Sequence, residues 1–161
     1  MIELNIDSTL RESQDIVMAT IGIDIGNVII GGDHEDRTFF GDQYLTAPAV
    51  WGAFDSIKEL VNQGHEIVLI SKCGIPVMTK TVSWLQYHDF FEHTGVSIDS
   101  MYFVKKRPEK APLAQELQVD IMIDDREDII QSMEGFVELP ILFTSWDTTM
   151  ETIKEYDSTH V

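Results

Sequence analysis

Residues 21–32 read IGIDIGNVIIGG, with an aspartate set between glycines directly after an apolar run. Three ways of handling a phosphate group are compatible with such a stretch. It could form a glycine-rich loop around a dinucleotide, an ATP-binding turn, or a strand that ends on a reactive carboxylate. The stretch alone does not decide among them, so the rest of the chain has to.

The composition is that of an ordinary globular domain, with 161 residues, 43% of them hydrophobic and 24% charged. We therefore expect one domain with a substantial core. No apolar run approaches the roughly 18 residues of a membrane span, and the acidic, polar amino terminus lacks the order of a signal peptide. Together with the single cysteine, Cys73, these features predict a cytoplasmic protein.

The formal net charge of −17 argues against non-specific binding to nucleic acid or to anionic membranes. The few cations are clustered, since six of the eleven Lys and Arg lie in three short places: Lys72; Lys105, Lys106, Arg107 and Lys110; and Arg126. This clustering predicts a local anion site, although a solvated patch explains residues 105–107 equally well. The oligomeric state does not follow from the sequence.

Apolar, β-branched runs predict five strands, over residues 20–25, 66–71, 101–104, 120–125 and 140–145. Helical patterns separate them, from near 48 to 64, after Pro76 through 78–85, over 111–118, and as short helices after 125 and after 147. Such alternation predicts a three-layer α/β fold with a Rossmann-like parallel sheet over residues 19–161. Residues 1–18 are expected to form an N-terminal arm or an added edge strand.

In open parallel sheets, ligands bind beyond the carboxyl ends of the strands. The sequence places Asp24, Ser71 and the pair Asp124–Asp125 at these ends, and Lys110 at the start of a helix after the third strand. Carboxylates suit Mg²⁺, whereas a hydroxyl and an ammonium group suit phosphate oxygens. The paired acids repel each other unless a cation joins them. The residues therefore predict a joint metal and phosphate site at one rim of the sheet.

The order Asp, Ser, Lys, Asp-Asp resembles that of the haloacid dehalogenase (HAD) superfamily. Its four motifs are similar to IGIDIGNVI (21–29), IVLISK (67–72), Lys110 with APLAQEL (111–117), and IMIDDRED (121–128). Bacterial receiver domains use the same residue types, but there the acidic pair precedes the lysine. A dinucleotide loop needs G-x-G-x-x-G, and the actin and sugar-kinase fold, which GIDIG also resembles, needs a second domain. The carboxylate interpretation of residues 21–32 is thus favoured.

The resemblance implies a Mg²⁺-dependent phosphomonoester hydrolase acting on a small phosphorylated substrate. Asp24 would be the nucleophile that forms an aspartyl-phosphate. Ser71, Lys72 and Lys110 would bind the phosphorylated substrate, with Lys110 also steadying Asp24, unless Lys105 or Lys106 takes its role.

The same resemblance assigns the metal ligands. Mg²⁺ would be held by Asp24, by the main-chain carbonyl of Gly26 and by Asp125, with Asp124 adjacent to the ion. Asp128, one helical turn further on, is expected to cap its helix rather than to reach the water molecules of the metal. Cys73 is expected to be inert.

One departure concerns Gly26, because many phosphatases of this superfamily carry there a second Asp that serves as acid and base. Glycine keeps the carbonyl for the metal but supplies no proton donor. His34, Asp33 or Glu35 could replace it, although a polar surface loop explains these residues more simply. The alternative is therefore a non-catalytic HAD-like protein that binds metal and phosphate. A module that binds partners through its acidic surface is a third candidate.

The segment of about residues 30–47 is too short for the full cap domain of many superfamily members, and we expect a small flap with flexible glycines. Its aromatic residues Phe39, Phe40 and Tyr44 could stack on a base or pack onto the body of the protein. IMIDDRED also resembles the acidic motif of small deoxyribonucleotidases. A nucleoside monophosphate is accordingly one candidate substrate.

Overall fold

The computed structural model describes residues 18–32 and 41–160. Its strands form one fully parallel sheet in the order β3-β2-β1-β4-β5. The strands are β1 (Thr20–Ile23), β2 (Glu66–Lys72), β3 (Met101–Val104), β4 (Ile121–Asp124) and β5 (Leu139–Leu142). The strand that precedes Asp24 therefore lies in the centre of the sheet.

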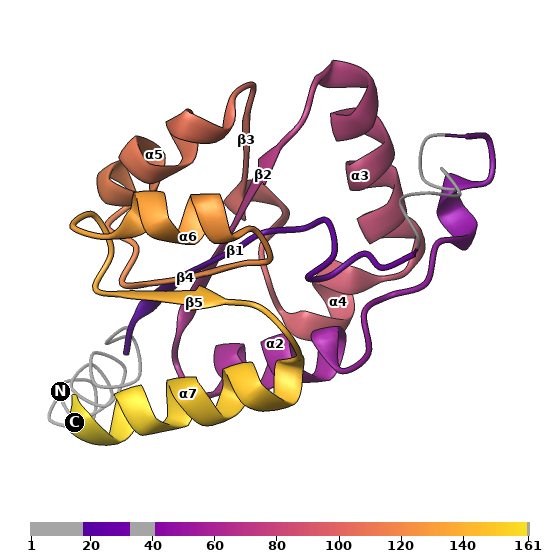
Figure 1. Ribbon diagram of the computed structural model, residues 1–161. Helices are drawn as coiled ribbons and strands as arrows, with labels where there is room; N and C mark the ends of the chain where they lie inside the picture. The colour runs from indigo at the N-terminus through magenta and orange to yellow at the C-terminus, as the bar shows by residue number, and fades with distance from the viewer. Residues whose placement is uncertain (1–17, 33–40, 161) are drawn as a thin grey trace, which may run out of the picture.

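Helices alternate with the strands and cover both faces of the sheet. They are α2 (Ala53–Asn62), α3 (Ile75–Tyr87), α4 (Phe90–Thr94), α5 (Lys110–Glu116), α6 (Glu127–Met133) and α7 (Trp146–Thr159). The 3-10 turns η2 (Tyr44–Thr46), η3 (Ile98–Ser100) and η4 (Arg107–Glu109) complete the described elements. Helices α5 and α6 lie on one side of the sheet, and α2 and α7 on the other (Figure 1). The predicted three-layer α/β fold is confirmed.

Two apolar clusters fill the space between the layers. On β2, Ile67 and Leu69 belong to the cluster shared with α2, α3, α4 and α7, whereas Val68 and Ile70 belong to the cluster shared with α5 and α6. Alternate residues of a strand point to opposite faces, so a strand buried on both sides reads as a continuous apolar run. That run made the strands visible in the sequence.

Gly22 in β1 leaves room for side chains that pack beside it on the α5 and α6 side of the sheet, foremost that of Met122 in the neighbouring strand β4. A Cβ atom at this position would lie 2.7 Å from Sδ of Met122 and 3.3 Å from Cγ1 of Val119. The first distance is too short for a methyl group unless the Met122 side chain moves, which a closely packed core resists. The glycine beside the candidate nucleophile is therefore explained by packing.

The predicted start of the first helix near Pro48 is wrong, because α2 begins at Ala53. The preceding residues are held in an extended conformation by the loop after β1. The Gly31 N–H donates to the Pro48 carbonyl at 2.7 Å, and the Val50 N–H donates to the Ile29 carbonyl at 2.8 Å. These main-chain bonds outweigh the helical spacing of the apolar residues.

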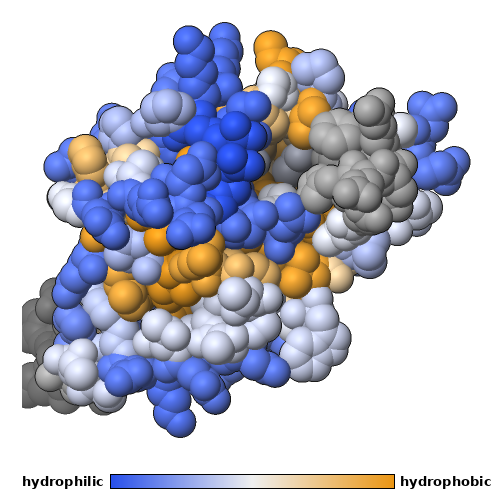
Figure 2. Space-filling view, in the orientation of Figure 1, coloured by the Kyte–Doolittle hydropathy of each residue, from blue (hydrophilic) through white to orange (hydrophobic). Residues whose placement is uncertain are grey.

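Two further boundaries differ near the carboxyl terminus. The last helix, predicted to be short, has 14 residues, and the Ser145 side chain caps it by accepting the Thr148 N–H at 3.2 Å. Strand β5 ends at Leu142 instead of continuing to residue 145. It is an edge strand, and Figure 2 shows apolar surface in a band at its level, between the hydrophilic surfaces of the two helical layers.

The predicted arm over residues 1–18 lies outside the described residues except for Met18, and so does the central part of the predicted flap. What is described of that flap contains η2, which packs near α3 through a hydrogen bond from Trp84 Nε1 to the Ala47 carbonyl at 2.9 Å. Within the described ranges, every helix is too short or too polar to cross a lipid bilayer.

Candidate active site

The candidate residues meet because the carboxyl ends of neighbouring parallel strands share one edge of the sheet. Asp24 directly follows β1, and its N–H donates to the carbonyl of Ile123 in β4 at 2.9 Å. Asp124 is the last residue of β4, and Ser71 is the last residue but one of β2. Positions far apart in the sequence thus lie at the same rim.

Lys110 joins the two strand ends. Its Nζ lies 3.0 Å from Oδ1 of Asp24 and 2.7 Å from Oδ2 of Asp124. All three residues are buried, with exposed fractions of 3% for Lys110, 7% for Asp24 and 0% for Asp124. Removing charges from water is costly unless they are paired, so the three groups depend on one another.

The two adjacent aspartates differ in what they contact. Both oxygens of Asp124 have partners, because Oδ1 accepts the Arg126 N–H at 3.0 Å and Oδ2 accepts from Lys110. Asp125 is half-buried, and its Oδ2 accepts from Nδ2 of Asn27 at 3.0 Å. Asp24, Asp124 and Asp125 each offer an oxygen within 4.8 Å of the other two. Carboxylate oxygens gathered in this way could hold a hard divalent cation such as Mg²⁺, with Asp24 and Asp125 better placed than Asp124, whose two oxygens already have partners.

The charges of this cluster oppose full ionisation. Burial, followed by the charge of Asp124, raises the pKa of Asp24 from 3.8 to about 8, against the lowering effect of Lys110. Burial likewise raises the pKa of Asp124. Burial acts to lower the pKa of Lys110, but the two carboxylates outweigh it and raise the value. A divalent cation beside Asp24 and Asp125 would favour the ionised carboxylates.

A cavity of about 330 Å³ opens at this rim. The residues around it are Asp24, Gly26, Asn27, Ser71, Lys72, Arg107, Lys110, Asp125, Arg126 and Ile129. The volume is at the lower end for ligand sites, which fits a small ligand. Six of the seven predicted site residues therefore line one cavity. The seventh, Asp124, is not among the lining residues but contacts Lys110, which is.

Several finer expectations can be compared with this geometry. Lys110, rather than Lys105 or Lys106, is the lysine placed at the carboxylates. The expected helix cap at Asp128 is confirmed only in part: the N-cap position of α6 is Arg126, but Asp128, in the first turn, accepts the Ile129 N–H through Oδ1 at 3.0 Å. There its Oδ1 accepts from Arg126 Nε at 3.0 Å. Burial raises the pKa of the Cys73 thiol, which disfavours the reactive thiolate.

Asn27 is a site residue that the sequence reasoning missed. Its backbone is left-handed, with φ of 65°, a conformation that asparagine tolerates better than most residues. This turn directs the side chain to Asp125, 98 positions away in the sequence. An asparagine three positions after Asp24, in a glycine-flanked turn, was the available signal.

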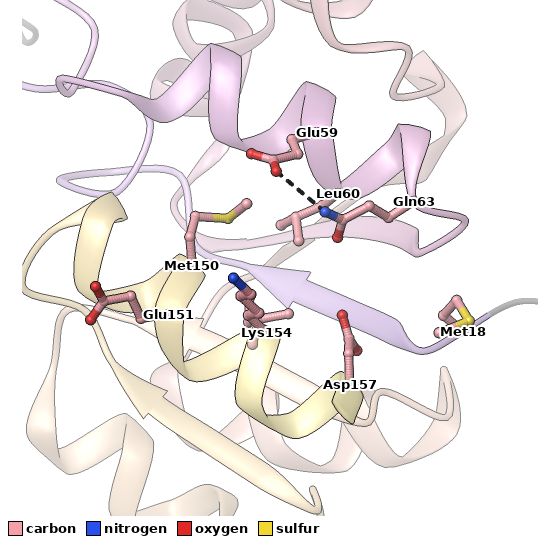
Figure 3. Close-up of a pocket in the computed structure, with 9 residues that line it drawn as sticks. Met18, Glu59, Leu60, Gln63, Met150, Glu151, Lys154 and Asp157 are labelled. Carbon is pink, nitrogen blue, oxygen red and sulfur yellow. Dashed lines mark hydrogen bonds between the residues drawn. The ribbon is translucent and has the colours of Figure 1, made fainter. Parts of the chain in front are cut away.

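A second cavity, of about 450 Å³, lies between α2 and α7 (Figure 3). Leu60, Met150, Ile153 and Met18 supply apolar surface, and Glu59 is hydrogen-bonded to Gln63 at 3.3 Å. It shares no lining residue with the cavity at Asp24. Nothing in the described structure shows what would bind there. The cavity at Asp24, which is lined by carboxylates and by Lys110, is therefore the candidate active site.

The sequence matches no protein-family model and no curated protein. Its fold, however, is similar to that of solved structures. D,D-heptose 1,7-bisphosphate phosphatase from B. bronchiseptica, complexed with magnesium and phosphate, has a TM-score of 0.60 at 11% identity, covering 86% of this chain and 99% of that one. A protein from Burkholderia xenovorans LB400 assigned as a haloacid dehalogenase-like hydrolase has a TM-score of 0.58 at 10% identity, covering 85% of this chain and 97% of that one.

The class C acid phosphatase from Bacillus anthracis is also similar, with a TM-score of 0.55 at 14% identity, covering 95% of this chain and 84% of that chain. At these identities the likeness concerns the fold. The chain has the α/β fold of HAD-type hydrolases, as its four motifs predicted.

Proposed function

We propose that this protein is a Mg²⁺-dependent phosphomonoester hydrolase that acts through an aspartyl-phosphate on Asp24. The observation that carries the proposal is the buried ammonium group of Lys110 between Asp24 and Asp124, at the edge of a cavity that Asp24 lines. A buried carboxylate held by a lysine at the end of a central strand is costly for stability alone. The magnesium and phosphate of the B. bronchiseptica phosphatase support the same chemistry.

In the first step, the carboxylate of Asp24 forms a bond to phosphorus while the bond from phosphorus to the ester oxygen breaks. That oxygen leaves with the electron pair and takes a proton from solvent, because Gly26 supplies none. In the second step, a water oxygen bonds to phosphorus and loses one proton to solvent, the bond to Asp24 breaks, and inorganic phosphate and the carboxylate are released. Lys110 holds Asp24 in position in both steps and neutralises developing charge.

Mg²⁺ would be held by Asp24, the main-chain carbonyl of Gly26 and Asp125. The ion would reduce the repulsion between the attacking carboxylate and the phosphate dianion. Asp124 has no oxygen without a partner among the described residues, so its part is to position Lys110. Asn27 would orient Asp125 through its hydrogen bond.

The transferred phosphoryl group would lie near Ser71, which is buried and lines the cavity, and near Lys110. The small volume favours a small substrate, and a nucleoside monophosphate is one candidate. Of the aromatic residues proposed to stack on a base, Phe39 and Phe40 lie outside the described residues. Tyr44 has Nζ of Lys80 5.5 Å from its ring centre, which occupies one of its faces.

A second candidate is a non-catalytic protein that binds metal and phosphate. The observation that favours it is Gly26, which leaves the position of the usual proton donor without a side chain. Such a protein would keep the carboxylates and Lys110 for binding.

The test is turnover of 4-nitrophenyl phosphate with Mg²⁺ and with EDTA. We expect metal-dependent turnover that falls at least about a thousandfold in Asp24→Asn. Asp128→Asn is the matched control, because this exposed aspartate pairs only with Arg126 among the described ion pairs. Turnover that survives Asp24→Asn or EDTA contradicts the proposal. Calorimetric Mg²⁺ binding without turnover supports the non-catalytic alternative. If turnover is observed, a panel of nucleotides and sugar phosphates ranks the substrates.

A further inference from the structure

Four cations line the cavity at Asp24, in a chain that has only eleven Lys and Arg and a net charge of −17. Two of them are engaged: Lys110 by Asp24 and Asp124, and Arg126 by Asp128. Lys72 and Arg107 belong to none of the ion pairs among the described residues, and both are exposed. Both charges are therefore present at the mouth of the cavity outside any described ion pair, although the charge of Arg107 also contributes to lowering the pKa of Asp128.

These two cations leave the sheet at the same corner. Lys72 ends β2 and is paired in register with Val104, the last residue of β3. The Cys73 N–H donates to the carbonyl of Val104 at 3.0 Å, which fixes the two chain segments beside each other. Arg107 begins η4 three residues after Val104. One cation therefore comes from each of two neighbouring strand ends, on the side of the cavity opposite Asp125 in the strand order.

The inner part of the site has its own charge balance. Three carboxylates and Lys110 give a net charge of −2 when ionised, which one bound divalent cation would cancel. In the proposed function, the buried residues Lys110 and Ser71 bind the phosphoryl group that is transferred to Asp24. Lys72 and Arg107 lie further out, where the remainder of a small substrate would extend from the phosphorus atom. A cavity mouth with two exposed cations outside the described ion pairs favours an anion there.

We infer that the preferred substrate is a small phosphomonoester whose leaving group carries a second oxyanion, a carboxylate or another phosphate, bound by Lys72 and Arg107. The inference rests on the proposed hydrolysis at Asp24 and narrows its substrate class. Arg107 supplies a planar fork that suits either oxyanion, and Lys72 supplies a point charge beside it.

The experiment compares three esters with one aromatic body: phenyl phosphate, 4-carboxyphenyl phosphate and the bisphosphate of 1,4-dihydroxybenzene. We expect Arg107→Gln and Lys72→Gln to lower kcat/KM for the anionic esters about five- to tenfold more than for phenyl phosphate, mainly through KM. Because each variant is compared with the wild type on the same ester, differences in leaving-group chemistry cancel. Lys105→Gln, an exposed lysine outside the cavity lining, is the control and should leave all three values unchanged.

The outcomes separate the inference from the function on which it rests. A differential loss on the carboxylate alone, or on the bisphosphate alone, supports the inference and identifies the oxyanion. Equal losses on all three esters overturn it, because the two cations would then serve the transferred phosphoryl group. If the wild type hydrolyses phenyl phosphate but the two variants lose no kcat/KM on any ester, the inference is overturned while the proposed function stands. Absence of any Mg²⁺-dependent turnover overturns the proposed function as well.

Discussion

Nε1 of Trp146, at the start of α7, donates a hydrogen bond of 2.8 Å to the main-chain carbonyl of Val28, 118 positions earlier in the chain. Val28 lies in the turn that follows Asp24 and Gly26, and both partners are fully buried. The last helix therefore holds in place the loop that would present a carbonyl to the metal. A buried carbonyl without a partner costs about 1–3 kcal/mol.

We expect Trp146→Phe to lower the free energy of unfolding by about 2–4 kcal/mol, since it removes both this bond and part of a buried ring. Urea unfolding followed by circular dichroism measures the loss. Trp51→Phe is the matched control, because Trp51 is 76% exposed and should change stability by less than about 0.5 kcal/mol. Equal losses in the two variants would show that the bond to Val28 contributes nothing.

Replacing Lys110 by Met should destabilise the metal-free protein by about 3–5 kcal/mol, because two buried carboxylates lose their cation. Lys105→Met, at an exposed position, should have little effect. Adding Asp124→Asn to Lys110→Met should recover part of the stability by removing one uncompensated charge. The prediction fails if the double variant is no more stable than the single one in EDTA.

Stability without metal should depend on pH through Asp24. Its pKa of about 8 in the folded protein exceeds the ordinary value of 3.8, so the folded state holds this proton more tightly than the unfolded state. The contribution is therefore fully present below about pH 4 and is lost as the pH rises to about 8, by at most about 1.4 kcal/mol per pH unit. The raised pKa of Asp124 acts in the same direction.

The measurement is urea unfolding in EDTA between pH 5 and pH 8, a range chosen to lie between the two pKa values of Asp24. Wild type should lose stability with rising pH more steeply than Asp24→Asn, and saturating Mg²⁺ should flatten the wild-type curve, because the ion favours the ionised carboxylate. Parallel curves for the two proteins in EDTA would contradict the assignment of this proton to Asp24.

Position 26, where many phosphatases of the HAD superfamily carry the proton donor, has room for a side chain. A Cβ atom built on Gly26 would have no heavy atom within 4 Å, and the backbone there is not left-handed. We therefore expect Gly26→Asp to fold and to raise kcat at least about tenfold on esters of alkyl alcohols, which need a proton on leaving. Gly26→Asn has the same shape without the acid and is the control. Equal rates in the two variants would exclude acid catalysis from this position.

The order of the elements and the members of the site could be predicted because both depend on local signals. Strands buried on both faces give continuous apolar runs, and the carboxyl ends of parallel strands meet at one edge. That rule brought Asp24, Ser71 and Asp125 to one cavity although more than 40 residues separate each from the next. The resemblance to the HAD motifs then suggested the role of each residue.

What could not be predicted depends on contacts between distant segments. The extended conformation of residues 48–50 comes from main-chain bonds to Ile29 and Gly31, which helical spacing does not reveal. The contact from Asn27 to Asp125 requires a left-handed turn at one specific residue. Asp124 and Asp125 differ because both carboxylate oxygens of Asp124 already accept hydrogen bonds, one from Lys110 and one from the Arg126 N–H.

The central position of β1 in the sheet has a consequence for how this protein would lose activity. Because β1 is hydrogen-bonded to β2 on one side and to β4 on the other, fraying of either outer strand leaves Asp24 anchored. The chemistry should therefore survive local opening at the rims and disappear only with cooperative melting of the whole domain. Heat inactivation and global denaturation should share one midpoint.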